Sequence, residues 1–272
     1  MELDKMSYEE VEAYLAGGRG IVVLPVGATE EHGPHGPLGT DTFAAALVAG
    51  KVAEKLGGVV APALPYGMSE DMVNFRGAVT LRPSTLALVV KEVCENFVRD
   101  GYQVILVLNG NRPNDASCQL GTLEARGDSD AHILYLAYQD ANKGRLREVL
   151  GPEHAGHVTE TDQRYGADGH GGSVELSLAL AYAPGCVKMD RRVVPDRRLA
   201  DELRSFPFRS VMFTEEFMVT DGVMGDPTLV SAELGERIAE RTAEHIAAEV
   251  RRYLALFEGR RRRRPPAVKA RR

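Results

Sequence analysis

The stretch that decides the fold is residues 21–41, IVVLPVGATEEHGPHGPLGTD. Its first six residues, IVVLPV, form an uninterrupted apolar run of strand length, which is typical of a buried parallel strand. A loop rich in glycine and proline follows, and it carries several acidic and imidazole side chains. From Asp41 the apolar residues recur at helical spacing until the chain reaches Gly57. The stretch therefore predicts a strand, a polar loop and a helix in succession.

Strands and helices are expected to alternate along the rest of the chain. Further apolar runs predict strands at 59–64, 104–108 and 132–136. Helices are predicted at 7–15 with a capping box at its start, at 84–101 with Ser84 as its cap, from 114 onward, at 172–181 and at 231–257. This alternation predicts a three-layer α/β/α sandwich around a mainly parallel sheet. Ligands bind such sheets beyond the carboxyl ends of the strands, so the chemistry is expected just after Val26 and Leu108.

The composition is that of a globular protein. Of 272 residues, 44% are hydrophobic and 26% are charged, which excludes a disordered chain, a collagen and a coiled coil. The sequence has no apolar stretch of about 18 residues and no signal-peptide pattern at its acidic N-terminus, so neither a membrane span nor secretion is expected. Three widely spaced cysteines fit reduced thiols in the cytoplasm. We expect one cytoplasmic domain over residues 1–259.

Charge is distributed unevenly along the chain. The formal net charge is −6, and the eight basic residues within 260–272 leave −14 on residues 1–259. An acidic body disfavours nucleic acid as a partner, because phosphate binding needs a basic face. Two prolines and the lack of aromatic residues in 260–272 favour a disordered tail over a nucleic-acid-binding segment.

The loop after the first strand contains a candidate metal site. Glu30 and His32 are two residues apart, so on an extended backbone their side chains point the same way. The loop can return Asp41 to the same place. One imidazole and two carboxylates suit a divalent cation, and a carboxylate such as Asp41 can bridge two ions. Spacing alone leaves a second interpretation open, in which Thr40 or Asp41 only caps the following helix.

A series of motifs occurs in the order found in one known family. Residues 24–35, LPVGATEEHGPH, with GTD at 39–41, closely resemble the opening motif of the creatininase (creatinine amidohydrolase) family. Residues 66–70 (YGMSE), 109–110 (NG), 170–177 (HGGSVELS) and 222–227 (GVMGDP) are similar to its later motifs. The resemblance covers nearly the whole chain. It implies a creatininase-like fold, often in a homohexamer, and metal-dependent hydrolysis of C–N bonds other than ordinary peptide bonds, in small amides, formamides or modified peptides.

The resemblance also implies roles for individual residues. Glu30 would ligate one metal ion and His32 another, with Asp41 as the bridge between them. His170 would carry a proton during catalysis, and Glu175 would be a metal-linked carboxylate or a supporting one. The implied ion is zinc, manganese or iron.

The segment after the third strand departs from the family pattern. Asn111 stands where the family has a metal-ligating histidine, and Pro113 stands where creatininase itself has a carboxylate. These losses favour one ion over two, with Glu175, Asp115 or water completing the ligands. Asn111 still offers a neutral amide oxygen as a replacement ligand. Arg112 would oppose a second dication, and its guanidinium suits an anionic group on a substrate.

Three further residues are candidates for contacts with substrate or metal: His35 in the first motif, and Ser69 and Glu70 in the second. The predicted function is a metal-dependent amidohydrolase that acts on a small molecule or a modified peptide, in a biosynthetic pathway. Two alternatives stay open. In the first alternative, the chain is a catalytically impaired relative that serves as a binding or scaffold subunit. In the second, it is an enzyme that uses a metal at the same pocket without hydrolysis.

Overall fold

A parallel sheet of four strands forms the centre of the computed structural model, which describes residues 1–18, 20–127, 130–205 and 220–257. The strands are β1 (Ile21–Val26), β2 (Val59–Val60), β3 (Val104–Asn109) and β4 (His132–Ala137). They lie in the order β2-β1-β3-β4. β1 and β3 pair in register from Ile21 opposite Val104 to Val26 opposite Asn109, and β4 extends the sheet beyond β3. The carboxyl ends of β1, β3 and β4 therefore meet at one edge.

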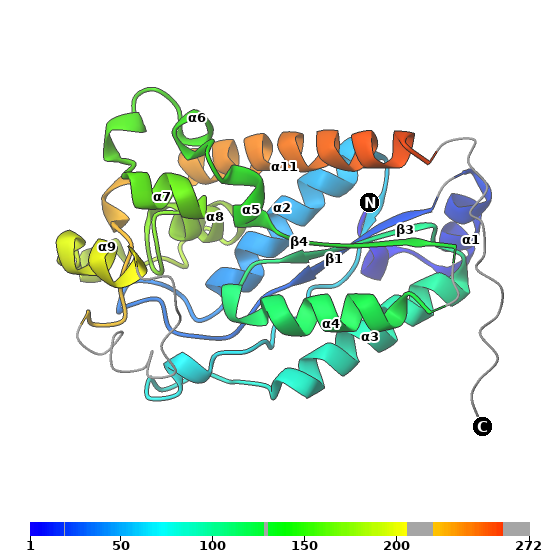
Figure 1. Cartoon of the computed structure of the whole chain (residues 1–272), viewed down its shortest axis with the longest axis horizontal. Coiled ribbons are helices and arrows are strands. Elements are labelled where there is room, and N and C mark those ends of the chain that lie inside the picture. The colour runs from blue at the N-terminus through cyan, green and yellow to red at the C-terminus, as the bar shows by residue number, and fades with distance from the viewer. Residues whose placement is uncertain (19, 128–129, 206–219, 258–272) are drawn as a thin grey trace.

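Helices cover both faces of this sheet (Figure 1). One face carries α2 (Thr40–Leu56), α8 (Ser173–Tyr182) and α11 (Ala232–Ala255), and the other carries α3 (Pro83–Asp100) and α4 (Asp115–Ala125). The remaining helices are α1 (Tyr8–Ala16), α5 (Tyr138–Asn142), α6 (Leu146–Leu150), α7 (Glu160–Tyr165) and α9 (Arg197–Ser205). Short 3-10 turns are η1 (Leu3–Lys5), η2 (Glu70–Met72), η3 (Arg112–Asn114), η4 (Ala155–His157), η5 (Met189–Arg191) and η6 (Pro227–Leu229). The three-layer α/β prediction is confirmed.

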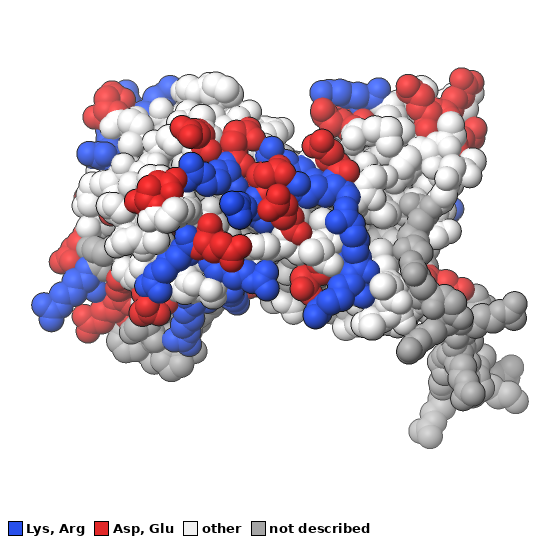
Figure 2. All heavy atoms as spheres, turned by 90° about the horizontal axis from the view of Figure 1, so that it is seen from above, with Lys and Arg blue, Asp and Glu red and all other residues white. Residues whose placement is uncertain are grey.

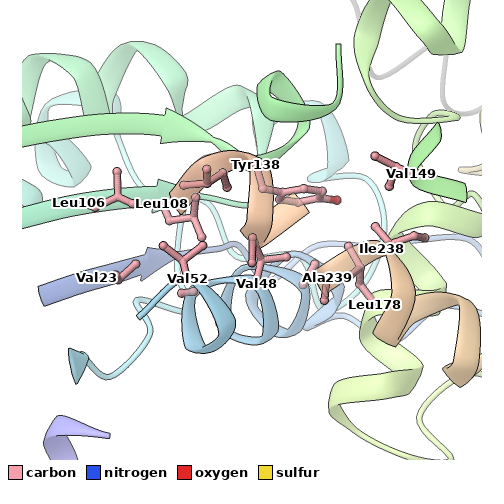
Figure 3. Close-up of a cluster of buried hydrophobic side chains, with 14 of the residues drawn as sticks. Val23, Val48, Val52, Leu106, Leu108, Tyr138, Val149, Leu178, Ile238 and Ala239 are labelled. Carbon is pink, nitrogen blue, oxygen red and sulfur yellow. The ribbon is translucent and has the colours of Figure 1, made fainter. Parts of the chain in front are cut away.

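Alternate strand residues enter two separate cores, because successive side chains of a strand point to opposite faces. Val23, Leu106 and Leu108 face α2, α8 and α11, where they meet residues such as Val48 (Figure 3). Their neighbours in β1 and β3 pack against α3 and α4. Every residue of β1 and β3 is buried, which explains why both strands are apolar without alternation.

Two element boundaries differ from the prediction. The strand expected over 59–64 ends as a regular strand at Val60, because Pro62 has no N–H for the ladder. The chain nevertheless stays beside β1, where Leu64 N donates to Pro25 O at 3.0 Å. Ser84 is not the cap of α3. The helix begins at Pro83 with Arg82 in the cap position, since the fixed φ of proline suits the first helical residue.

Acidic and basic side chains are interspersed over the face that lies uppermost in Figure 1 (Figure 2). Ion pairs also join α2 to α11: Lys51 pairs with Glu236 at 2.8 Å, and Lys55 pairs with Glu240. The predicted tail at 260–272 lies outside the described residues. Among the residues that are described, no helix has both the length and the apolar character that crossing a membrane requires.

Candidate metal centre and active site

Five side chains singled out from the sequence converge at the carboxyl edge of the sheet. Glu30 and His32 come from the loop after β1, and Asp41 comes from the first turn of α2. His170 lies just before α8, and Glu175 lies in its first turn. The structure thus brings together residues that are up to 145 positions apart in the sequence.

His32 occupies the centre of one half of this cluster. Its Nδ1 lies 3.3 Å from the carbonyl oxygen of Glu30, which can only accept, so Nδ1 carries the proton. The other nitrogen, Nε2, lies 3.6 Å from Asp41 Oδ1 and 3.6 Å from Glu175 Oε2. His32 is fully buried, and its Nε2 has no hydrogen-bond partner. The structure therefore presents an imidazole lone pair to two carboxylates.

Asp41 does not cap the helix that follows it. The cap position of α2 is Gly39, and no side chain bonds to the free N–H groups there. Asp41 is 3% exposed, and its Oδ2 has no hydrogen-bond partner. Its side chain lies in the first turn of α2, at the positive end of the helix dipole. This geometry supports the metal interpretation of the loop over the capping interpretation.

His170 lies against the other half of the cluster. Its Nε2 donates to the carbonyl oxygen of Glu31 at 2.7 Å, and its Nδ1 lies 3.8 Å from Glu30 Oε1. Its ring stacks on that of His32 with 4.1 Å between the centroids. Burial alone would lower the pKa of His170, but the carboxylates of Glu31, Glu175 and Glu30 outweigh it and raise the pKa to about 10.

The buried carboxylates of the cluster are poorly compensated by protein groups. Burial, together with the nearby Asp41 carboxylate, raises the pKa of Glu30 well above its usual value. Burial also raises the pKa of Glu175. A dication offsets such a charge excess, and carboxylate oxygen and imidazole nitrogen are ligands that zinc and manganese use. Glu30, His32 and His170 each place a ligand atom within 4.8 Å of the others. The residues therefore fit a divalent cation.

The loop after β3 contacts the cluster through Asn111. The Nδ2 of this buried amide, rather than its oxygen, faces Glu30 Oε2, at 3.4 Å. Arg112 turns elsewhere: its guanidinium lies 2.9 Å from Asp140 and 3.5 Å from Asp115. Asp115 in turn accepts hydrogen bonds from Tyr135 and Asn109. Arg112 and Asp115 thus belong to a network that holds this loop against β4.

The remaining candidate residues, His35, Ser69 and Glu70, differ in how far they are buried. His35 is fully buried, and its Nε2 lies 3.3 Å from the carbonyl oxygen of Gly171, next to His170. Ser69 is buried beside Glu30 and favours its charged form, although its hydroxyl makes no hydrogen bond of standard geometry. Glu70 is exposed at the start of η2.

Two residues of the site region were missed in the sequence. Glu31 anchors His170 through its carbonyl oxygen, and its carboxylate accepts from the N–H of Gly33 at 2.7 Å. Asp168 accepts from the N–H groups of Ser173 and Val174, so it fixes the start of α8 relative to His170. Glu31 lies inside the first motif and was passed over because its neighbours are the more obvious ligands. Asp168 carries no local signal beyond an acidic residue shortly before a predicted helix.

Together, the fold and the site define an α/β protein with a buried acid and imidazole cluster that fits a cation. The family model described as creatinine amidohydrolase matches residues 4–250, and the chain belongs to this creatininase family. The creatinine amidohydrolase of Pseudomonas putida is 30% identical over 261 residues, which cover 91% of this chain and 95% of the relative. The mycofactocin precursor peptide peptidase of Mycolicibacterium smegmatis is 31% identical over 243 residues, covering 86% and 85%.

Solved structures agree with this assignment. A structure named Creatininase Mn has a TM-score of 0.77 at 26% identity and covers 92% of this chain and 97% of that chain. A creatininase variant of Zn-Zn type has the same TM-score and coverage at 28% identity. The family resemblance and the fold predicted from the sequence are both confirmed.

Proposed function

We propose that this chain is a metal-dependent amidohydrolase. Its family is named for an amidohydrolase, and two similar relatives are named as a creatinine amidohydrolase and a peptide peptidase. The observation that carries the proposal is the buried Nε2 of His32, which has no hydrogen-bond partner and lies 3.6 Å from each of two carboxylates. A buried polar atom that has no hydrogen bond and lies next to buried carboxylates is costly unless a ligand satisfies it.

The cation would be held by His32 and Asp41, in a pocket that the carboxylates of Glu30 and Glu175 also line. When bound, it supplies Lewis acidity, which polarises a carbonyl group and lowers the pKa of a coordinated water towards about 7. The names of the solved relatives mention manganese and zinc, which supports one of these metals here. Iron is the third metal that the donor set fits.

His170 and Glu175 are the proposed proton carriers. With Nε2 held by Glu31, His170 exchanges its proton at Nδ1, and its raised pKa keeps that proton in place at neutral pH. It is suited to protonate the nitrogen that leaves when a C–N bond breaks. Glu175, whose pKa is raised by burial, is the second proposed carrier because its Oε2 lies at the same site, 3.6 Å from His32 Nε2.

The substrate class is a small amide or a modified peptide. The relatives' names cover creatinine and a precursor peptide, so the proposed bond is not limited to amides other than peptide bonds. Arg112 is not assigned to the substrate, since two carboxylates already pair with its guanidinium. A homo-oligomer in the cytoplasm stays a prediction of the sequence.

Hydrolysis in ¹⁸O-labelled water tests the proposal. The manganese-loaded or zinc-loaded chain is incubated with creatinine, other cyclic amides, formamides and short peptides, and products are analysed by mass spectrometry. We expect one ¹⁸O atom in the product of a cleaved C–N bond, and no product with Asp41→Asn. Product without ¹⁸O would indicate the non-hydrolytic alternative. A chain that binds no metal and cleaves no amide would favour the scaffold alternative.

A further inference from the structure

The orientation of the Asn111 amide is fixed by its neighbours. Its Nδ2 lies 2.8 Å from Met68 O, 3.4 Å from Glu30 Oε2 and 3.5 Å from Asn114 Oδ1. The Met68 carbonyl can only accept a hydrogen bond, so the atom facing it must be the N–H donor. An amide nitrogen that donates hydrogen bonds offers no lone pair to a metal ion. Asn111 therefore meets Glu30 as a donor and not as an oxygen ligand.

The loop holds Asn111 in this orientation. The Asn109 side chain accepts from Asn111 N at 3.1 Å and donates to Asn111 O at 2.6 Å. Asn109 Oδ1 also accepts from Asn114 Nδ2 at 3.1 Å. These bonds fix the backbone of Asn111, and turning its amide by 180° would bring the amide oxygen against Met68 O, where the Nδ2 bond of 2.8 Å now lies.

The two oxygens of Glu30 therefore both face protein groups. Oε2 accepts from Asn111, and Oε1 lies 3.8 Å from the Nδ1 of His170. In the other half of the cluster, Glu175 Oε2 accepts a hydrogen bond from Gly171 N at 3.1 Å, but His32 Nε2 and Asp41 Oδ2 have no hydrogen-bond partner. Ligand atoms about 2.1 Å from a tetrahedral ion lie about 3.4 Å apart. The two separations of 3.6 Å from His32 Nε2 are close to that value.

We propose that Asn111 holds Glu30 outside the metal's ligand set by a hydrogen bond, so that the chain binds one divalent cation, between His32, Asp41 and Glu175. The inference rests on the proposed function and refines it, since it names the ligands. Glu30 then acts as a positioning residue that fixes His170 beside the ion. Pro113 has no side-chain atom that could replace the missing ligand, and Asp115 is bonded to Tyr135 and Asn109 instead.

Manganese binding to the full chain tests the number of ions. Chelated and then dialysed protein is loaded with Mn²⁺, its metal content is measured by mass spectrometry, and its electron paramagnetic resonance spectrum is recorded. We expect one equivalent per chain and the six-line spectrum of an isolated Mn²⁺. Two equivalents with a spin-coupled spectrum would overturn the inference while leaving the proposed function intact. No bound manganese, zinc or iron would overturn both.

Two matched substitutions test which carboxylate is a ligand. Glu175→Gln is expected to weaken manganese binding by about 100-fold or more, beyond the 10- to 100-fold that supporting residues contribute. Glu30→Gln is expected to keep one equivalent, with binding weakened by about tenfold or less. Circular dichroism confirms that both variants are folded. If Glu30→Gln loses the ion and Glu175→Gln keeps it, the cation lies on the Glu30 and His170 side and the inference is wrong.

A gain of binding tests the part played by the loop. The double substitution Asn111→His with Pro113→Glu gives this loop two side chains that can ligate a metal, and it removes the amide that bonds to Glu30. We expect a second equivalent of manganese and spin coupling between the two ions. A folded double variant that still binds one equivalent would show that Asn111 does not set the number of ions. This measurement needs no substrate, so it stands apart from any assay of hydrolysis.

Discussion

His170 connects the backbone of Glu31 to the side chain of Glu30, and its ring stacks on His32. Its protonation is therefore coupled to the charges of the whole cluster. A group in this position contributes by placing a proton where the leaving nitrogen appears, and such a contribution is about 10²- to 10⁴-fold in rate.

Replacing this imidazole should separate proton transfer from metal binding. We predict that His170→Gln lowers kcat by about 10²- to 10⁴-fold while the bound metal stays at the wild-type level. His245→Gln is the control, because His245 lies on α11 near Glu148, away from the cluster. Steady-state kinetics and metal analysis of the same preparations check this. A loss of less than about tenfold would remove His170 from the mechanism.

The sequence predicts which side chains lie together where neighbours in the chain are also neighbours in space. The positions of Glu30, His32 and Asp41 follow from one strand end and one short loop. The orientation of Asn111 does not, because it depends on the carbonyl oxygen of Met68, which is 43 residues away in the sequence. The ion pairs of Arg112 depend likewise on Asp140 in α5, a short helix that no sequence pattern predicts.

At the level of elements, the sequence predicts a helix start where a capping side chain lies next to it in the chain. The capping box of Ser7 and Glu10 begins α1, and Ser231 caps α11 by accepting from Leu234 N, as predicted. Helices α5, α6 and α7 were missed because each has six residues or fewer, too short for a helical period to show. The early end of β2 also depends on one residue, Pro62, within an otherwise apolar run.

The contact between α8 and α11 positions Glu175, and a glycine permits it. A Cβ at Gly235 would clash with the carbonyl oxygen of Ser177 in α8. We predict that Gly235→Ala lowers the free energy of unfolding by about 1–3 kcal/mol, because the two helices must move apart. Gly50→Ala, in α2, is the matched control: a Cβ there meets nothing within 4 Å.

Denaturant unfolding measures both variants. Gly50→Ala is expected to raise the free energy of unfolding by about 0.5–1 kcal/mol, since alanine restricts the unfolded chain and suits a helix interior. Equal effects of the two substitutions would show that the contact of Gly235 with α8 is not tight.

For the whole molecule, the unbalanced cluster predicts how stability depends on pH when no metal is bound. The pKa values of His170, Glu30 and Glu175 are all raised in the folded state. The folded chain then binds more protons than the unfolded chain, so stability is present at low pH and decreases as pH rises. For His170 the decrease falls between about 6.5, its unfolded value, and about 10.

Thermal unfolding of the chelated protein checks this dependence. We predict a Tm at pH 9 that is below the Tm at pH 6 by at least about 2–4 °C, the shift that about 1 kcal/mol produces in chains of 150–250 residues. His170→Gln should reduce the difference. A Tm that stays constant or increases with pH would show that the cluster is already balanced by protein groups.

A bound metal ion should stabilise the fold, because its charge offsets that of the buried carboxylates in the cluster. At a free manganese concentration about 100 times the Kd, the free energy of unfolding is expected to increase by about 2.7 kcal/mol. Asp41→Asn should remove this increase, because it takes away a carboxylate that faces His32 Nε2. The comparison is made by denaturant unfolding with and without manganese. An equal gain in Asp41→Asn would place the stabilising ion elsewhere.

The central claim is that a divalent cation binds at the carboxyl edge of the sheet, next to His32. Anomalous diffraction from crystals grown with manganese tests it most directly. We predict one strong anomalous peak per chain, within ligand distance of His32 Nε2, Asp41 and Glu175. An anomalous map with no peak among these side chains, at full manganese concentration, would contradict the claim.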